Sequence, residues 1–174
     1  MGLQAKACSV RANTKHELIN GEIYAMAGAK ENHVKITGNV FRNIANHLIT
    51  SPCNVYASDM KLLAGCDCYY PDVFVKCDPD DNDQLVKEKP ILIIEVLSES
   101  TKHFDRGNKL QNYLKISTLQ EYALVSQTGM EIWIYRRRGK KWEMEILTDN
   151  DEVNFISINL TIPVKDLYVK VLFT

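Results

Sequence analysis

Hydrophobic positions along the chain predict two helices. Within residues 31–50, apolar residues and one threonine recur at alternating steps of three and four, which is typical of an amphipathic helix that buries one face. They are Val34, Thr37, Phe41, Ile44 and Leu48. A second helical stretch covers residues 101–116, with Leu110, Tyr113 and Leu114 on its buried side. The chain therefore has a predicted helix on either side of its central apolar segments.

Segments rich in Val, Ile, Tyr and Phe, bounded by turn-forming residues, predict strands. They cover residues 21–27, 55–63, 69–76, 91–98, 122–126, 131–137 and 141–147, and a last apolar run covers 156–162. Residues 91–97 are apolar on both faces, which predicts a central strand covered on each side. The polar segment DPDDNDQLVKEKP is expected to be a solvated loop. The order helix, three strands, helix, strand, then further strands predicts an α/β (α+β) fold with a central mixed sheet flanked by helices.

Composition restricts the choice of function classes. The 174 residues, 45% of them hydrophobic, are enough for one core, so a single domain over residues 1–174 is expected. The net charge of −1 lacks the basic excess of most non-specific DNA binders. The one basic run, at residues 136–141, is interpreted as a charged hairpin tip. No apolar stretch approaches the roughly 20 residues of a membrane-spanning helix.

The five cysteines are odd in number, and no secretory leader precedes them. A reducing cytoplasm is the expected location. Cys66 and Cys68 form a C-x-C pair without a second ligand pair for zinc, so they are interpreted as structural or surface thiols.

Two acidic residues carry the candidate chemistry. Glu95 interrupts the apolar segment ILIIEVL, where an uncompensated carboxylate would cost several kcal/mol. Strand alternation places Ile91, Ile93, Glu95 and Leu97 on one face. In YYPDVFV, Asp72 follows a proline and is expected on the face of Phe74, where it can approach Glu95. A divalent cation, Mg²⁺ or Mn²⁺, would relieve their repulsion, activate water and stabilise phosphoryl charge.

The segments YYPDVFV, EVLSEST and DRGNKLQNYL, together with HELINGEIYAMAG, SDMKLL and EYALVSQ, resemble the PD-(D/E)XK nuclease superfamily, specifically its Uma-two family of restriction endonucleases. The resemblance covers nearly the whole chain. It implies a restriction-endonuclease-like core, a divalent metal held by Asp72 and Glu95, and DNA as the substrate. The superfamily's usual lysine, two residues after the second acid, is replaced here by Leu97. The resemblance points to Lys109 on the following helix as its substitute.

Spacing alone favours a different role for Lys109, an ordinary i,i+4 surface pair with Asp105.

Four residues are candidates for supporting roles. Glu22 is either a third acid near the metal or an exposed edge-strand residue, and Asp59 supports the site or terminates a strand. Ser98 caps the second helix or contacts a phosphate. Asp105 shares a polar helix stripe with Lys109. His33, His47 and His103 are interpreted as surface or partly buried residues.

Three functions remain open at this point. The first is a metal-dependent endonuclease acting on DNA, as a homodimer if both strands are cut. The second keeps the fold and hydrolysis but takes RNA, a branched junction or another substrate. The third is a catalytically degenerate module that binds nucleic acid or a protein partner without cleavage.

Overall fold

The computed structural model describes residues 15–26, 28–97 and 107–173. Its larger sheet has the strand order β11-β10-β9-β8-β6-β3. These strands are β3 (Asn54–Ala57), β6 (Val73–Lys76), β8 (Pro90–Leu97), β9 (Glu121–Ser126), β10 (Glu131–Arg138) and β11 (Lys141–Thr148). Strands β8 and β9 are parallel, whereas the other neighbours are antiparallel. The expected mixed sheet is confirmed.

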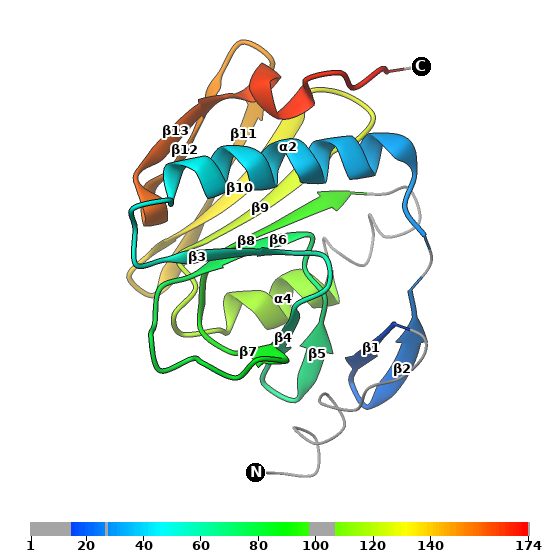
Figure 1. Ribbon diagram of the computed structural model, residues 1–174, viewed down its shortest axis with the longest axis vertical. Helices are drawn as coiled ribbons and strands as arrows, with labels where there is room; N and C mark the ends of the chain where they lie inside the picture. The colour runs from blue at the N-terminus through cyan, green and yellow to red at the C-terminus, as the bar shows by residue number, and fades with distance from the viewer. Residues whose placement is uncertain (1–14, 27, 98–106, 174) are drawn as a thin grey trace.

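Among the described residues, helices α2 and α4 cover opposite faces of this sheet (Figure 1). Helix α2 (Glu31–His47) packs on one face, against a cluster that includes Val73 and Val75. Helix α4 (Asn108–Leu114) lies on the other face, where its Tyr113 shares a cluster with Phe74. Successive β6 side chains thus enter different cores, as strand alternation requires. Strand β8 lies between β6 and β9 with both faces buried, which confirms its predicted central position.

A second sheet has the order β2-β1-β5-β4-β7. Its strands are β1 (His16–Ile19), β2 (Glu22–Ala25), β4 (Lys61–Ala64), β5 (Asp67–Tyr69) and β7 (Val86–Lys87). At the end of the chain, hairpin β12 (Glu152–Phe155) and β13 (Leu160–Pro163) and the 3-10 turns η1 (Ile156–Ile158) and η2 (Val164–Tyr168) extend the α2 core. Figure 1 shows this hairpin beside α2.

Two predicted strands are each divided between the two sheets. Segment 55–63 becomes β3 and β4 because the chain turns at Ser58, whose φ is +54°. Segment 69–76 becomes β5 and β6, separated by a break that contains Pro71. Proline has no N–H to donate to a ladder, so it marks the start of β6, as expected. Each division moves the chain from one sheet to the other.

The buried stripe of α2 is rotated relative to the prediction. Val34 is 58% exposed, whereas Ile36, Val40 and Ile44 are fully buried at steps of four residues. Leu48, just after the helix, is buried as predicted. The prediction fails at Val34 because two apolar stripes compete in this segment, and the sheet covers the one that contains Ile36.

Segment 78–90, expected to be a solvated loop, is held by buried charges. The ammonium group of Lys76 donates to the carbonyls of Asp78 and Asp81, each at 2.7 Å. Lys87 also donates to Asp81, at 3.2 Å, and is itself only 5% exposed. Residues 79–80, 82–85 and 88 are exposed, so the segment is largely the solvated loop that was expected, anchored at Asp81 and Lys87.

Cysteines 53 and 77 form a disulfide between β3 and β6. They directly flank the paired residues Asn54 and Lys76, so the antiparallel register places them opposite one another. The expectation of reduced thiols is wrong for this pair and for Cys68, which is also disulfide-bonded. Cys66, by contrast, is an exposed free thiol, as predicted.

The basic run lies on the β10–β11 hairpin, as predicted, and its arginines are engaged within the chain. Arg136 pairs with Glu121 and Glu145, and Arg138 pairs with Glu143. Arg137 donates to backbone carbonyls at the end of α4. No helix among the described residues is long and apolar enough to span a membrane.

Candidate active site

Asp72 and Glu95 are anchored to each other's strands. A carboxylate oxygen of Asp72 accepts the Val96 N–H at 2.8 Å, and a carboxylate oxygen of Glu95 accepts the Asp72 N–H at 3.2 Å. The β6–β8 ladder ends at Val73 and Ile94, so these side chains replace the next backbone bonds. The two acids therefore lie at the same end of neighbouring strands.

Glu95 shares the α4 face with Ile93 and Leu97, in agreement with the predicted alternation. Ile91 does not share it. It packs with the α2 cluster because the β6–β8 pairing shifts register between Val75 and Lys76, which leaves Ile91 as the unpaired extra residue of a bulge.

The buried Glu95 carboxylate, with a side chain 4% exposed, has two donors on α4. The Lys109 ammonium lies 2.9 Å from its Oε1, and the Tyr113 hydroxyl donates to the same oxygen at 3.1 Å. Burial, and then the negative charge of Glu95, raise the pKa of Tyr113 well above its usual value. Tyr113 thus remains a neutral donor near neutral pH, and Lys109 supplies the compensating charge. An exposed Lys109–Asp105 pair does not fit, because the Lys109 side chain is 6% exposed.

Asp72 is also contacted from the α2 side. The Nε2 atom of His33, in the first turn of α2, lies 3.2 Å from its Oδ2, and both side chains are 17% exposed. Asp72 was expected on the Phe74 face, but its carboxylate lies at the strand end, where it reaches a residue of the opposite helix. His33 is partly buried, as predicted, but its acidic partner was not foreseen.

A third acid, Glu17 of β1, completes the cluster. Its Oε1 lies 3.2 Å from the Lys109 ammonium and accepts the Tyr70 N–H at 3.1 Å. Glu17 escaped the sequence analysis, although one signal was available. It is in phase with the buried Ile19 of the same short strand, so alternation predicts that it points inward.

The chemistry of this donor set fits a divalent cation. The carboxylates of Glu17, Asp72 and Glu95 outnumber the Lys109 ammonium, which leaves two excess negative charges while His33 is neutral. Carboxylate oxygens are the ligands that Mg²⁺ prefers, and Mg²⁺ is usually held by one or two of them plus water. Among residues 15–26, 28–97 and 107–173, no three His, Cys, Asp or Glu side chains form a ready cation cage. Any cation bound here would therefore need water or substrate oxygens as further ligands.

Comparisons with known proteins identify the family of the chain. The model of the Uma2 family, described as "Putative restriction endonuclease", matches residues 4–165. The chain belongs to the Uma2 family. Two uncharacterised proteins of Synechocystis sp. are similar to it. The protein slr1290 is 37% identical, and the match covers 91% of this chain and 85% of slr1290. The protein sll1609 is 36% identical, and the match covers 83% of this chain and 86% of sll1609.

A solved structure shares the fold of this Uma2 chain. The crystal structure of a putative nuclease of the DUF820 group from Anabaena variabilis superposes with a TM-score of 0.80. The match covers 97% of this chain and 98% of that protein at 17% identity. At that identity the likeness shows the fold alone, which is a restriction-endonuclease-like nuclease fold.

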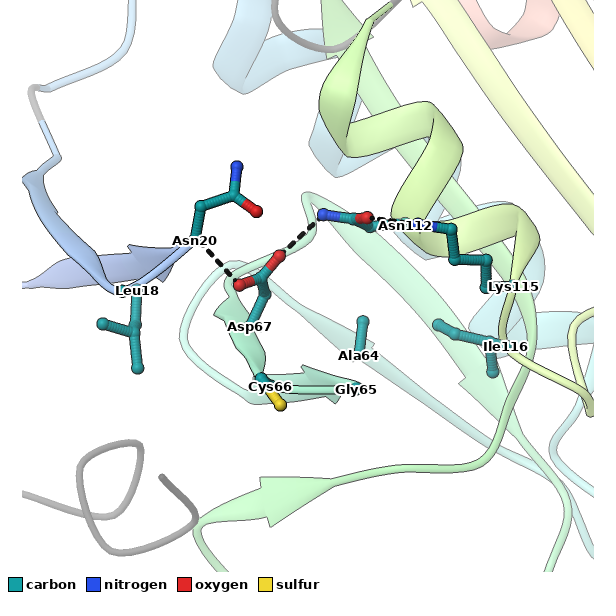
Figure 2. Close-up of a pocket in the computed structure, with 10 residues that line it drawn as sticks. Leu18, Asn20, Ala64, Gly65, Cys66, Asp67, Asn112, Lys115 and Ile116 are labelled. Atoms are coloured by element: carbon teal, nitrogen blue, oxygen red, sulfur yellow. Dashed lines mark hydrogen bonds between the residues drawn. The ribbon is translucent and has the colours of Figure 1, made fainter. Parts of the chain in front are cut away.

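In this Uma2 domain, helix α4 is fixed at two places, and this determines where Lys109 lies. Asn112 donates to the buried Asp67 carboxylate at 2.6 Å, beside a cavity of about 480 Å³ (Figure 2). The Tyr69 hydroxyl donates to the same carboxylate, and its ring lies 5.5 Å from the Lys109 ammonium. At the other end of the helix, Arg137 donates to the carbonyls of residues 114 and 116.

The two remaining candidates that the structure describes, Glu22 and Asp59, do not join the acid cluster. Glu22 of the Uma2 domain is exposed and accepts a hydrogen bond from Tyr24 at 2.7 Å. The Asp59 side chain is 93% exposed and pairs with Lys15 in the turn after β3. Ser98 and Asp105 lie outside the described residues, as does His103.

Proposed function

We propose that the chain is a metal-dependent endonuclease that hydrolyses DNA phosphodiester bonds. Asp72 and Glu95 hold Mg²⁺ or Mn²⁺, and Lys109 assists. The observation that carries this proposal is the mutual anchoring of Asp72 and Glu95 at one end of β6 and β8, with a buried lysine beside them. The Uma2 family description and the nuclease fold support the same class of reaction.

Each residue has a distinct role in this mechanism. The bound cation would lower the pKa of water and neutralise charge on the phosphoryl group. Asp72 and Glu95 supply hard oxygen ligands whose orientation is fixed by backbone N–H groups. The ammonium group of Lys109 donates hydrogen bonds that orient the attacking water or stabilise the negative charge that develops on the phosphoryl oxygens.

Plasmid and single-stranded DNA, incubated with purified protein and Mg²⁺ or Mn²⁺, provide the test. Asp72→Asn keeps the shape of the side chain but removes its charge, and is expected to abolish cleavage. Asp149→Asn, in the exposed turn after β11, is the matched control and should retain full activity. Equal cleavage by Asp72→Asn and wild type would contradict the assignment. Parallel assays with RNA and branched junctions decide the substrate class.

The second candidate is a degenerate module that binds without cleavage. It is motivated by the net charge of −1 and by the basic run, whose arginines are already paired with acids or carbonyls of the same chain, so that this run offers little positive charge to hold a DNA substrate for cleavage. Calorimetry separates the two functions. DNA binding without any Mn²⁺ binding at millimolar concentration would support the module, and Mn²⁺ binding that Asp72→Asn abolishes would support the enzyme.

A homodimer and a cytoplasmic location also remain proposals. Cutting both strands of a duplex generally requires two active sites, so a two-fold dimer is expected in analytical ultracentrifugation at working concentration. Disulfides are rare in the cytosol, so the redox state of Cys53 and Cys77 tests the location. Free thiols at both positions in freshly isolated protein would support a reducing cytoplasm, whereas the Cys53–Cys77 disulfide of the structure, found in such protein, would contradict it.

A further inference from the structure

Glu17 is a buried acid that belongs to neither strand of the proposed metal pair. It lies on β1, in the smaller sheet, and is 9% exposed. A carboxylate in such a place is costly unless its charge and its hydrogen bonds are satisfied. Two groups that satisfy Glu17, the Lys109 ammonium and the Tyr70 N–H, are both connected directly to the site.

The first contact determines where the Lys109 charge lies. An ammonium group has three donors on a flexible stem, so one carboxylate alone leaves it free to rotate. Here Lys109 lies 2.9 Å from Glu95 and 3.2 Å from Glu17, and its ammonium is within 6 Å of the rings of Tyr69 and Tyr113. The two carboxylates come from different sheets, Glu17 from β1 and Glu95 from β8. Lys109 is therefore held from two sides.

The second contact holds the segment that carries Asp72. Tyr70 lies in the break between β5 and β6, where the chain passes from one sheet to the other. Its N–H donates to Glu17 in that break, and the next N–H after Pro71, that of Asp72, donates to Glu95. Glu17 and Glu95 thus fix successive donors of the same short segment.

We infer that Glu17 is a positioning residue of the hydrolytic site. Glu17 holds the Lys109 ammonium beside Glu95, and it also fixes the segment that precedes Asp72. This inference rests on the proposed function and adds to it a residue from the smaller sheet. Glu17 acts through Lys109 and Tyr70, without contact to the reacting atoms. Its removal should therefore lower kcat more than it changes the KM for DNA.

Two substitutions separate charge from hydrogen bonding. Glu17→Ala removes both and should lower kcat about 10–100-fold, the range measured when outer partners of metal ligands are removed. Glu17→Gln keeps an acceptor for Tyr70 and Lys109 and should recover part of this loss. The matched control is Glu121→Gln. Glu121 is also buried, pairs with Arg136 and accepts two backbone N–H groups, but it lies at the far end of the sheet.

A second measurement does not depend on activity. Acetic anhydride labelling followed by mass spectrometry reports how accessible the Lys109 amine is. Glu17→Ala should increase the labelling rate of Lys109 several-fold, whereas Glu121→Gln should leave it at the wild-type rate even if it lowers the melting temperature. If the wild type proves inactive, the proposed function fails, but the labelling still tests whether Glu17 holds Lys109.

Two results would overturn the inference. One is a Glu17→Ala protein with wild-type kcat and wild-type Lys109 labelling. The other is a lower kcat in both Glu17 variants with unchanged Lys109 labelling, since Glu17 would then act by some route other than Lys109. If Glu17→Ala does not fold, Glu17→Gln gives the decision on the same two readouts.

Discussion

Replacing Lys109 with methionine removes a buried ammonium from between two buried carboxylates while keeping an unbranched side chain. The side chains of Lys109, Glu17 and Glu95 are 6%, 11% and 4% exposed, so water cannot readily replace the lost charge. Removing one partner of a buried pair costs about 3–5 kcal/mol. Tyr113 and the N–H groups of residues 70 and 72 still donate to these acids, which favours the lower end, about 3 kcal/mol.

For a chain of this length, that loss lowers the melting temperature by roughly 6–12 °C, at about 2–4 °C per kcal/mol. Circular dichroism melts at pH 7 without divalent metal measure it. Lys115→Met, on the exposed residue directly after α4, is the control and should change stability by less than about 0.5 kcal/mol. In Lys109→Met, adding Glu17→Gln should restore part of the stability, because it removes one of the uncompensated charges. A Lys109→Met protein within about 1 kcal/mol of wild type would show that the buried ion pair does not exist.

Three further predictions concern stability. Tyr113→Phe should cost about 1.5–3 kcal/mol in urea unfolding, since Glu95 loses a donor. Because the pKa of Tyr113 is raised by burial, the folded chain keeps a proton that the unfolded chain loses above about pH 10. The melting temperature of the wild type should thus fall as pH rises beyond 10, more steeply than that of the phenylalanine variant. Removing the Cys53–Cys77 disulfide, which spans 24 residues, by replacing both cysteines with serine should cost roughly 3–4 kcal/mol in thermal melts without reductant. Ile44→Ala in the α2 core should cost about 2–5 kcal/mol in the same urea assay, and a cost below 1 kcal/mol would contradict its full burial.

Much of the fold could be predicted from the sequence because its central elements have strong local signals. Strand β8 is a long apolar run, and its length and composition alone predict a covered central strand. The β10–β11 hairpin also has strong local signals, because alternating apolar residues predict its two strands and a glycine predicts the turn between them. Helix α2 was found from its periodicity, but its orientation was not, because the choice between the stripes of Val34 and Ile36 depends on what the sheet presents.

The candidate site was predicted only in part, for a related reason. Glu95 has a local signal, a charge within an apolar strand, and Asp72 has the adjacent proline. Glu17 and His33 have weak signals of their own. They become part of the site through contacts with residues 92 and 39 positions away, respectively, along the chain. Such pairings depend on the crossing of α2 and the placement of the smaller sheet, which neither period nor composition specifies.

One of the two segments that were predicted as single strands, residues 69–76, carries part of the site. A continuous strand over residues 69–76 would keep Asp72 in a regular ladder, with its N–H and its neighbours' N–H groups paired to backbone. The break at Pro71 frees the Asp72 N–H to bind the Glu95 carboxylate and frees the Tyr70 N–H to bind Glu17. Two buried acids are thereby satisfied by donors that an unbroken strand would have used elsewhere. Moving the proline should therefore disturb the acid cluster before it disturbs either sheet.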